Sequence, residues 1–258
     1  MGEKIEFERE NLASTSVRRE PSPHADRLWH LRRSGLMDGL TLSDTQAIVS
    51  ICRDRIYLKE EVIFDQGDPA DSLFLLNRGC VRISVRNIHD REKILDLYPT
   101  GILGENPLTQ EPSFQVRATA HEDSWISIIP RNQFTDLIQE RPSIALNYGK
   151  ILCQRLYEAR EDIQAHIFLD AEQRLATTLL KLANIYGLPM PGQGSMVKLR
   201  ISLTHEHLAH LVGANRPHVS TIMGRFRRKG LVSYLGRKLL IHPKKMGGLV
   251  AVTGNRKT

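Results

Sequence analysis

The sequence predicts an α+β protein in which an N-terminal antiparallel β-roll, a long helix and a C-terminal winged helix-turn-helix follow one another. Strand patterns over residues 57–130, a heptad repeat after Pro142 and two capped helices near the C-terminus support this prediction. The expected divisions are a flexible tail at 1–27, a sensor roll at 28–140, a long helix at 141–169, a winged helix-turn-helix at 170–246 and a second tail at 247–258.

Alternating strand patterns indicate the roll. Residues 81–86 (VRISVR) alternate apolar and polar side chains, which is the period of a half-buried strand. Residues 125–129 (WISII) are apolar on both faces of the expected strand, as in a fully buried one. Turn sequences recur at intervals of about 8–12 residues, a spacing typical of a small antiparallel barrel or roll.

A heptad seam indicates the long helix. Its a/d positions recur at alternating steps of four and three residues, a spacing by which two helices can pair. These positions are Ala145, Gly149, Leu152, Leu156, Ala159, Ile163 and His166. A second stripe of Ile144, Tyr148 and Ile151 is expected to pack on the roll. The alternative is one ordinary buried helix, but small Ala145 and Gly149 favour close approach of a partner, so we expect a homodimer.

The charge is divided unevenly along the chain. From Met196 onward there are 13 Lys and Arg and one acid, which gives a net charge of +12. The rest holds 23 of the 36 basic and 28 of the 29 acidic residues, a net charge of −5. A basic C-terminal segment on an acidic body favours a polyanion-binding module. Attachment to a membrane surface would require a basic amphipathic helix or a lipid anchor, so nucleic acid is the preferred partner.

Membrane and disulfide classes are excluded on composition. No apolar run is longer than four residues, whereas a spanning helix needs about 20. The acidic N-terminus has no signal-peptide pattern, so a cytoplasmic protein without a membrane partner is expected. Cys52, Cys80 and Cys153 are too few and too scattered for a disulfide framework, and we expect all three in the core.

The segment LTHEHLAHLVGANRPHVSTIMGRFRRKG, residues 203–230, predicts a helix-turn-helix. Thr204 can cap the first helix, Gly213 supplies the turn, and Asn215 can cap the second helix, with Pro217 in its first turn. The second helix of this motif enters the major groove with its N-terminal residues against the bases. Residues 231–242, around a Gly236-Arg237 turn, predict a hairpin wing.

Nine residues are candidates for contacting DNA or for holding the elements that do. They are Thr204, Asn215, Arg216, Pro217, His218, Ser220, Thr221, Arg225 and Arg237. Arg216, His218, Ser220 and Thr221 are the expected base readers, since they lie near the start of the second helix. Arg216 can bind guanine O6 and N7 with both ends of its guanidinium. Arg225 and Arg237 are expected to reach phosphates.

The helix-turn-helix, behind a roll and a long helix, resembles the CRP/FNR family of bacterial transcription regulators. The resemblance runs from about residue 28 to 245 and includes FDQGDPADSLFLLNRGCVRISV, LYPTGILGE and FLDAEQRLATTLLKLAN. It implies a cyclic-nucleotide-binding-like roll of the jelly-roll or double-stranded β-helix type. It also implies a dimer that binds a palindromic operator, with RNA polymerase as a further partner.

The resemblance fails at the cyclic-nucleotide site. Gly104 and Glu105 match the family, but residues 112–114 (PSF) stand where it has an Arg and a small neighbour. Arg117 aligns with another family position, and residues 159–160 (AR) replace the hydroxyl pair that reads adenine. We therefore expect an effector other than cAMP, if any, and predict no cofactor. The candidate effector-pocket residues are Gly104, Glu105, Arg117 and Arg160.

Metal and catalytic sites are not expected. The family's iron–sulfur members need a group of N-terminal cysteines, and here none precedes Cys52. The HEHLAH run lacks the HExxH spacing, so its histidines are expected to be structural or surface residues. We predict no catalytic residue and no enzyme. Pro217 and Thr221 replace the family's usual Glu and second Arg, so the operator should keep the guanine opposite Arg216 and differ elsewhere.

Three functions remain open at the level of sequence. The preferred one is a homodimeric transcription regulator controlled by an unidentified signal. The second is the same regulator without any ligand, which a pocket filled by the roll's own side chains would support. The third is a sensor of a cyclic nucleotide or other small ligand whose basic C-terminal domain binds RNA or a protein partner.

Overall fold

The computed structural model describes residues 35–88, 92–105, 113–190 and 195–254. The expected tail at 1–27 and Pro112 lie outside these residues. A six-stranded antiparallel sheet forms the roll, in the order β1-β6-β3-β4, with β2 beside β6 and β5 beside β3. Its strands are β1 (Arg53–Tyr57), β2 (Val62–Phe64), β3 (Ser72–Arg86), β4 (Glu92–Tyr98), β5 (Gly101–Leu103) and β6 (Arg117–Pro130).

The long strands β3 and β6 are the centre of the roll. They pair from Ser72 opposite Pro130 to Ser84 opposite Arg117, with register shifts around Arg78 and Cys80. Gly79 lies at these shifts with φ +114°, and a Cβ there would lie 2.4 Å from Ser124 Oγ. Only glycine fits this crossing of the two strands.

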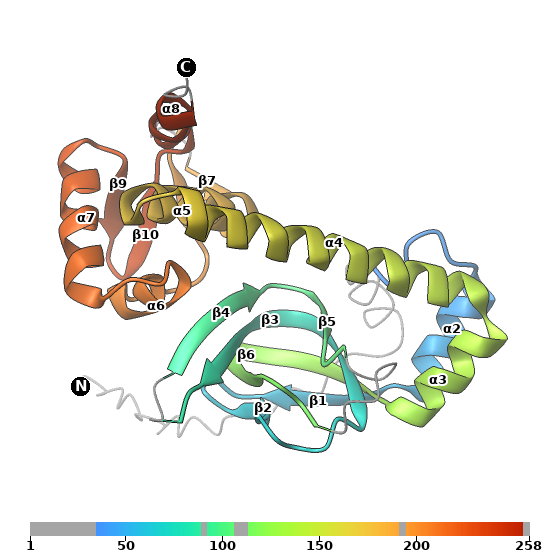
Figure 1. The fold of residues 1–258 in the computed structure, drawn as a ribbon. Helices are drawn as coiled ribbons and strands as arrows, with labels where there is room; N and C mark the ends of the chain where they lie inside the picture. The colour runs from blue at the N-terminus through green and yellow to red at the C-terminus, as the bar shows by residue number, and fades with distance from the viewer. Residues whose placement is uncertain (1–34, 89–91, 106–112, 191–194, 255–258) are drawn as a thin grey trace, which may run out of the picture.

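Three helices close one end of the roll. They are α2 (Leu42–Ile51), α3 (Arg131–Glu140) and the first half of α4 (Pro142–Phe168). Ile144 and Tyr148 of α4 are buried with Phe134 of α3 and Ile48 of α2, so the stripe predicted to face the roll does so. With 27 residues, α4 is about 40 Å long and runs over the roll to the C-terminal domain (Figure 1).

The predicted seam of α4 is increasingly exposed toward the end of the helix. Ala145, Gly149 and Leu152 are half-buried, whereas Leu156, Ala159 and Ile163 are exposed. Cys153 is exposed as well, which corrects the expectation of three core cysteines, while Cys52 and Cys80 are buried. The reason is that only one face of α4 contacts the roll in this stretch.

The C-terminal domain surrounds its own core. Helix α5 (Ala171–Tyr186) begins with a capping box between Asp170 and Gln173. The four-stranded sheet has the order β7-β8-β10-β9. The remaining elements are β7 (Gly187–Pro189), β8 (Val197–Leu199), α6 (His205–Leu211), α7 (Arg216–Arg228), β9 (Val232–Leu235), β10 (Lys238–Ile241) and α8 (Pro243–Gly254).

Helix α8 corrects one predicted boundary. The expected tail from 247 begins inside this helix, which continues to Gly254. Met246 is fully buried, and Val250, one turn later, packs on the same core. This i, i+4 pair holds the helix against the domain. The two glycines at 247 and 248 favour a tail when the sequence is considered without this packing.

The roll and the C-terminal domain are in contact. Strand β4 lies beside α6 (Figure 1). Tyr186 of α5 donates a hydrogen bond of 2.9 Å to Leu97 O, and its hydroxyl lies 3.4 Å from Cys80 Sγ. Cys80 and Leu97 therefore belong to the C-terminal core although they lie on the roll. Within the described ranges, no helix has the length and apolar character needed to span a membrane.

Candidate nucleic-acid interface

Local capping sets the geometry of the helix-turn-helix. Thr204 Oγ1 accepts a hydrogen bond of 3.1 Å from His207 N, and Asn215 Oδ1 accepts one of 2.9 Å from His218 N. Gly213 adopts φ +62° in the turn. Ala209 and Val219 are buried where α6 crosses α7. The side chains of Thr204 and Asn215 thus fix the starts of the two helices, as their positions in the sequence predict.

The first turns of α7 present three of the predicted base readers. Arg216, His218 and Thr221 are exposed, together with Pro217. The Arg216 side chain is 69% exposed, and its Nε lies 3.9 Å from the Glu206 carboxylate, too far for a hydrogen bond. A long cation at the N-terminal end of an exposed helix suits guanine in the major groove.

Two other predicted contacts already have partners within the protein. Ser220 Oγ lies 2.9 Å from His205 Nδ1. Arg225 pairs with Glu172 of α5, and Lys229 Nζ lies 3.7 Å from the same carboxylate. The contacts of Arg225 and Lys229 with Glu172 connect the end of α7 to α5. Sequence reasoning missed them because Glu172 lies more than 50 residues from Arg225.

The wing lies beside α7, the second or recognition helix of the helix-turn-helix. Strands β9 and β10 pair from Val232 opposite Ile241 to Leu235 opposite Lys238. Gly236 has φ +60° in the connecting turn, and Arg237 next to it is exposed. The predicted hairpin is therefore present, with its arginine at the tip, where it can approach a phosphate.

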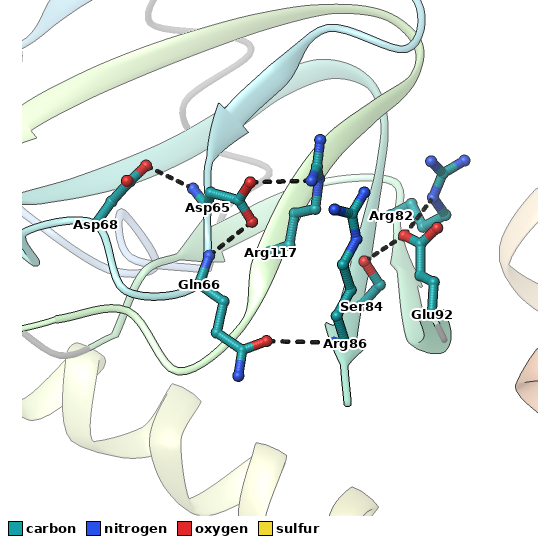
Figure 2. A network of polar contacts seen from close by, with 8 residues as sticks. All are labelled: Asp65, Gln66, Asp68, Arg82, Ser84, Arg86, Glu92 and Arg117. Atoms are coloured by element: carbon teal, nitrogen blue, oxygen red, sulfur yellow. Dashed lines mark hydrogen bonds and ion pairs between the residues drawn. The ribbon is translucent and has the colours of Figure 1, made fainter. Parts of the chain in front are cut away.

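The four candidate effector residues do not converge. Glu105 pairs with Arg155 of α4, and its carbonyl accepts a 2.7 Å hydrogen bond from the Tyr148 hydroxyl. Arg117 Nη1 lies 2.9 Å from Asp65 Oδ2 (Figure 2). Arg160 is exposed on α4. The two ionic candidates that lie on the roll are thus neutralised by different partners.

Aromatic side chains fill the roll next to Gly104. The rings of Phe64 and Phe114 stack with centroids 4.0 Å apart, and Phe74 lies 5.1 Å from Phe64. Phe114 is 3% exposed. A Cβ on Gly104 would lie 3.0 Å from Phe114 and 3.2 Å from Phe74. The segment that departs from the family's phosphate-binding pattern therefore places a buried ring beside Gly104.

Arg82 and Ser84 of β3 also have carboxylate partners. Arg82 donates to Glu60 at 3.1 Å, and Ser84 donates to Glu92 at 2.6 Å. Figure 2 shows Arg82, Ser84 and Glu92 together on one side of the network, and Asp65 with Arg117 on the other. Arg82 and Arg117 are thus balanced by nearby carboxylates, so these two side chains are poorly suited to bind a polyanion.

A histidine pair joins the roll to α6. His121 of β6 is buried, with Nε2 2.9 Å from Ser202 O, and its ring centroid lies 5.0 Å from that of His207. Burial, together with the nearby His121 and Arg82, lowers the pKa of His207 to about 4. Burial also lowers the pKa of His121. The sequence contains no signal for this pair, because His121 is distant from the HEHLAH run.

No group of three or more His, Cys, Asp or Glu residues arranged to hold a metal occurs in the described part of the chain. His210 of the HEHLAH run lies 3.2 Å from Glu206, and His207 packs against the roll.

A sensor-type β-roll joined by a long helix to a basic winged helix-turn-helix defines a DNA-binding regulator. Residues 54–141 match the cyclic nucleotide-binding domain, and residues 173–250 match the Crp-like helix-turn-helix domain. The cyclic AMP receptor protein of Thermus thermophilus is 30% identical over 203 residues, covering 78% of this chain and 89% of that protein. The chain belongs to the CRP/FNR family of transcription regulators, whose members are not enzymes.

One further relative and two solved structures are also similar to this chain. A CRP-like cAMP-activated global transcriptional regulator of Mycobacterium tuberculosis is 27% identical over 82% of this chain and 93% of its own length. The solved structure of the c-di-GMP-responsive global regulator of Xanthomonas campestris is similar in fold, with a TM-score of 0.67 and 23% identity over 78% of this chain and 99% of that one. A CRP/FNR-family regulator of Thermus thermophilus has a TM-score of 0.65 and 24% identity, over 77% and 98% of the two chains.

Proposed function

We propose that this protein is a homodimeric, sequence-specific transcription regulator that binds a palindromic operator without cAMP. The exposed N-terminal half of α7 carries this proposal. Arg216, His218 and Thr221 face outward at the start of a capped helix in a segment of net charge +12. In this arrangement α7 enters the major groove and Arg216 reads a guanine, while Arg237 of the wing contacts a phosphate.

The exposed seam of α4 supports dimerisation. The side chains of Leu156 and Ile163 are 52% and 59% exposed, and the small Ala159 lies between them. Pairing with the same seam of a second copy removes this apolar surface from water. A two-fold pair of α7 helices reads two half-sites about 34–36 Å apart, or about 10–10.5 base pairs. RNA polymerase is the further partner that we expect for such a regulator.

The interior of the roll supports an effector other than cAMP, if any. A cyclic phosphate requires charge-assisted hydrogen bonds. The described residues next to Gly104 are instead the rings of Phe74 and Phe114, and Glu105 is engaged by Arg155. Control by the amount of protein, without any ligand, is a second candidate because the roll's own side chains occupy this space. Titration calorimetry with cAMP and cGMP should detect no binding.

DNA-binding selection on the full-length protein, at stated salt and without effector, tests the central proposal. We expect a palindrome with a guanine that disappears in Arg216→Ala. Arg228→Ala is the matched control, since Arg228 is exposed at the far end of the same helix. This control should weaken binding to all sequences about equally. Equal affinity for all sequences would contradict the proposal and favour the RNA-binding or protein-binding alternative.

A further inference from the structure

One imidazole connects the recognition helix to the wing. His205 is the first residue of α6. Its Nδ1 lies 2.9 Å from Ser220 Oγ of α7, and its Nε2 lies 3.0 Å from the Tyr234 hydroxyl of β9. Both ring nitrogens are therefore engaged, and three separate elements meet at one side chain. Ser220 and Tyr234 are 14 positions apart in the sequence. In these two hydrogen bonds they are linked through the His205 ring and not to each other.

The protonation states suit this bridge. Burial, and secondly the charge of Arg216, lowers the pKa of His205, so the ring is neutral at pH 7. Burial raises the pKa of Tyr234, which keeps its phenol protonated. A neutral imidazole donates from one nitrogen and accepts at the other, whereas a hydroxyl can do either. Both hydrogen bonds can therefore form together in either tautomer of His205.

The position of the wing matters for DNA binding. Arg216 at the start of α7 and Arg237 at the tip of the wing are both exposed and must reach the same duplex. Tyr234 lies three residues before Arg237 on the wing, and Ser220 lies one turn after Arg216 on α7. A bridge between Ser220 and Tyr234 therefore fixes the spacing between the base-reading end of α7 and the phosphate-contacting tip.

We infer that His205, Ser220 and Tyr234 act together as positioning residues that hold the wing against the recognition helix, and that Ser220 does not read a base. This inference rests on the proposed binding of DNA by α7 and the wing. Ser220 Oγ is engaged by His205, whereas Arg216, His218 and Thr221 remain exposed for the bases. The structure thus reassigns a residue that sequence position alone placed among the base readers.

A double-mutant cycle tests this inference on the full-length protein and its selected operator. His205→Ala, Ser220→Ala and Tyr234→Phe should each raise the Kd about three- to tenfold, the range of one hydrogen bond. The double variant His205→Ala/Ser220→Ala should bind no more weakly than the weaker single variant, because the two residues act as one unit. His205→Gln, which keeps a donor and an acceptor, should restore most of the affinity.

Base preference separates positioning from reading. Repeated selection with Ser220→Ala and with His205→Ala should return the wild-type consensus. His218→Ala is the matched comparison, because His218 is exposed on the same helix and should change the preference at one position. The slope of the logarithm of DNA affinity against the logarithm of salt concentration should decrease in His205→Ala by the amount of about one phosphate contact. Arg237→Ala should show the same decrease.

Two results would overturn the inference: an altered consensus in Ser220→Ala, or additive losses for His205→Ala and Ser220→Ala. Ser220→Ala and Tyr234→Phe each remove only a hydroxyl, so they keep the test valid even if His205→Ala folds poorly. Failure of the proposed function is a separate outcome, because the wild-type protein itself would then select no sequence.

Discussion

The exposed arginines of the C-terminal domain have fewer carboxylate partners than those of the roll. In the roll, Arg82 and Arg117 form ion pairs with Glu60 and Asp65. In the described part of the C-terminal domain Arg225 pairs with Glu172, but no ion pair is formed by Arg227, Arg228 or Arg237, and the nearest carboxylate to Arg216 is 3.9 Å away. The cause is composition, because Glu206 is the single acid after Met196. Where acids are plentiful arginine stabilises the protein's own surface, and where they are scarce it remains available for a polyanion.

The interiors of the two regions differ as well. The roll has a closed aromatic centre, in which Phe64, Phe74 and Phe114 are in mutual contact. The C-terminal domain keeps its apolar residues in one core and leaves the outer face of α7 polar. The described centre of the roll is therefore filled by side chains, whereas the outer face of α7 is exposed and polar.

The largest expected effect is on the closed centre of the roll. Phe114→Ala removes a buried ring, so the free energy of unfolding of the roll should fall by about 3–5 kcal/mol. Chemical denaturation measures this loss. Ile88→Ala, at a side chain that is 96% exposed, is the control and should change stability by less than about 0.5 kcal/mol. A loss of less than about 1 kcal/mol would contradict the filled centre, because a well-packed buried ring costs more than that to remove.

The second effect concerns dimerisation, which would bring two copies of the DNA-binding surface together. Ile163→Glu places a charge in the α4 seam and should weaken dimerisation by about 3 kcal/mol, since each copy loses the burial of an isoleucine side chain. Sedimentation measures the dimer, and affinity for the full palindrome should fall with it. Tyr157→Glu is the matched control, because Tyr157 is 62% exposed on α4 but lies off the seam. Equal effects of the two variants would argue against this seam.

The third effect tests the arginine comparison directly. Arg216→Ala should reduce specific DNA affinity by about 1–3 kcal/mol, the range for a two-ended contact with guanine. Arg117→Ala removes an ion pair of the roll and should leave DNA affinity unchanged, with a loss of stability of about 1 kcal/mol or less. Binding titrations on both variants, at one salt concentration, provide the measurement. The comparison fails if Arg117→Ala impairs DNA binding as much as Arg216→Ala.

The smallest effect concerns the contact between the two regions. His207 faces His121 and Arg82 of the roll, and His210 lies near it on its own helix. The nearby acids are Glu60, which acts on both histidines, and Glu122, which acts on His121. The pKa of His207 is about 4 in this contact and returns toward its ordinary value of 6.5 when α6 leaves the roll. The separated state therefore binds more protons, so docking is fully stable above about pH 6.5 and weakens as the pH falls toward 4.

Hydrogen exchange of α6 at pH 7.5 and pH 5 measures this docking. His207→Gln keeps a side chain that can accept at the helix start, where Thr204 N donates to His207 Nδ1 at 3.4 Å. This variant should lose part of the pH dependence of the wild-type protein. The same pH dependence in both proteins would exclude His207 as its source.

The sequence by itself determined the features that depend on neighbours a few residues away. The caps at Thr204 and Asn215, the turn at Gly213 and the heptad spacing of α4 were all predicted, because capping and helical periodicity act within one or two turns. The charge division was also evident, since it needs only counting. These features were sufficient for the fold class and the family.

Only the tertiary structure decided the partners across the fold. It placed Ser220 against His205, Arg225 against Glu172, and His121 against His207, and it extended α8 past 247 because Val250 packs on the core. It also left Cys153 exposed. These outcomes depend on which surfaces meet when the helices and strands pack, and residues far apart in the chain carry no periodic or capping signal of that meeting.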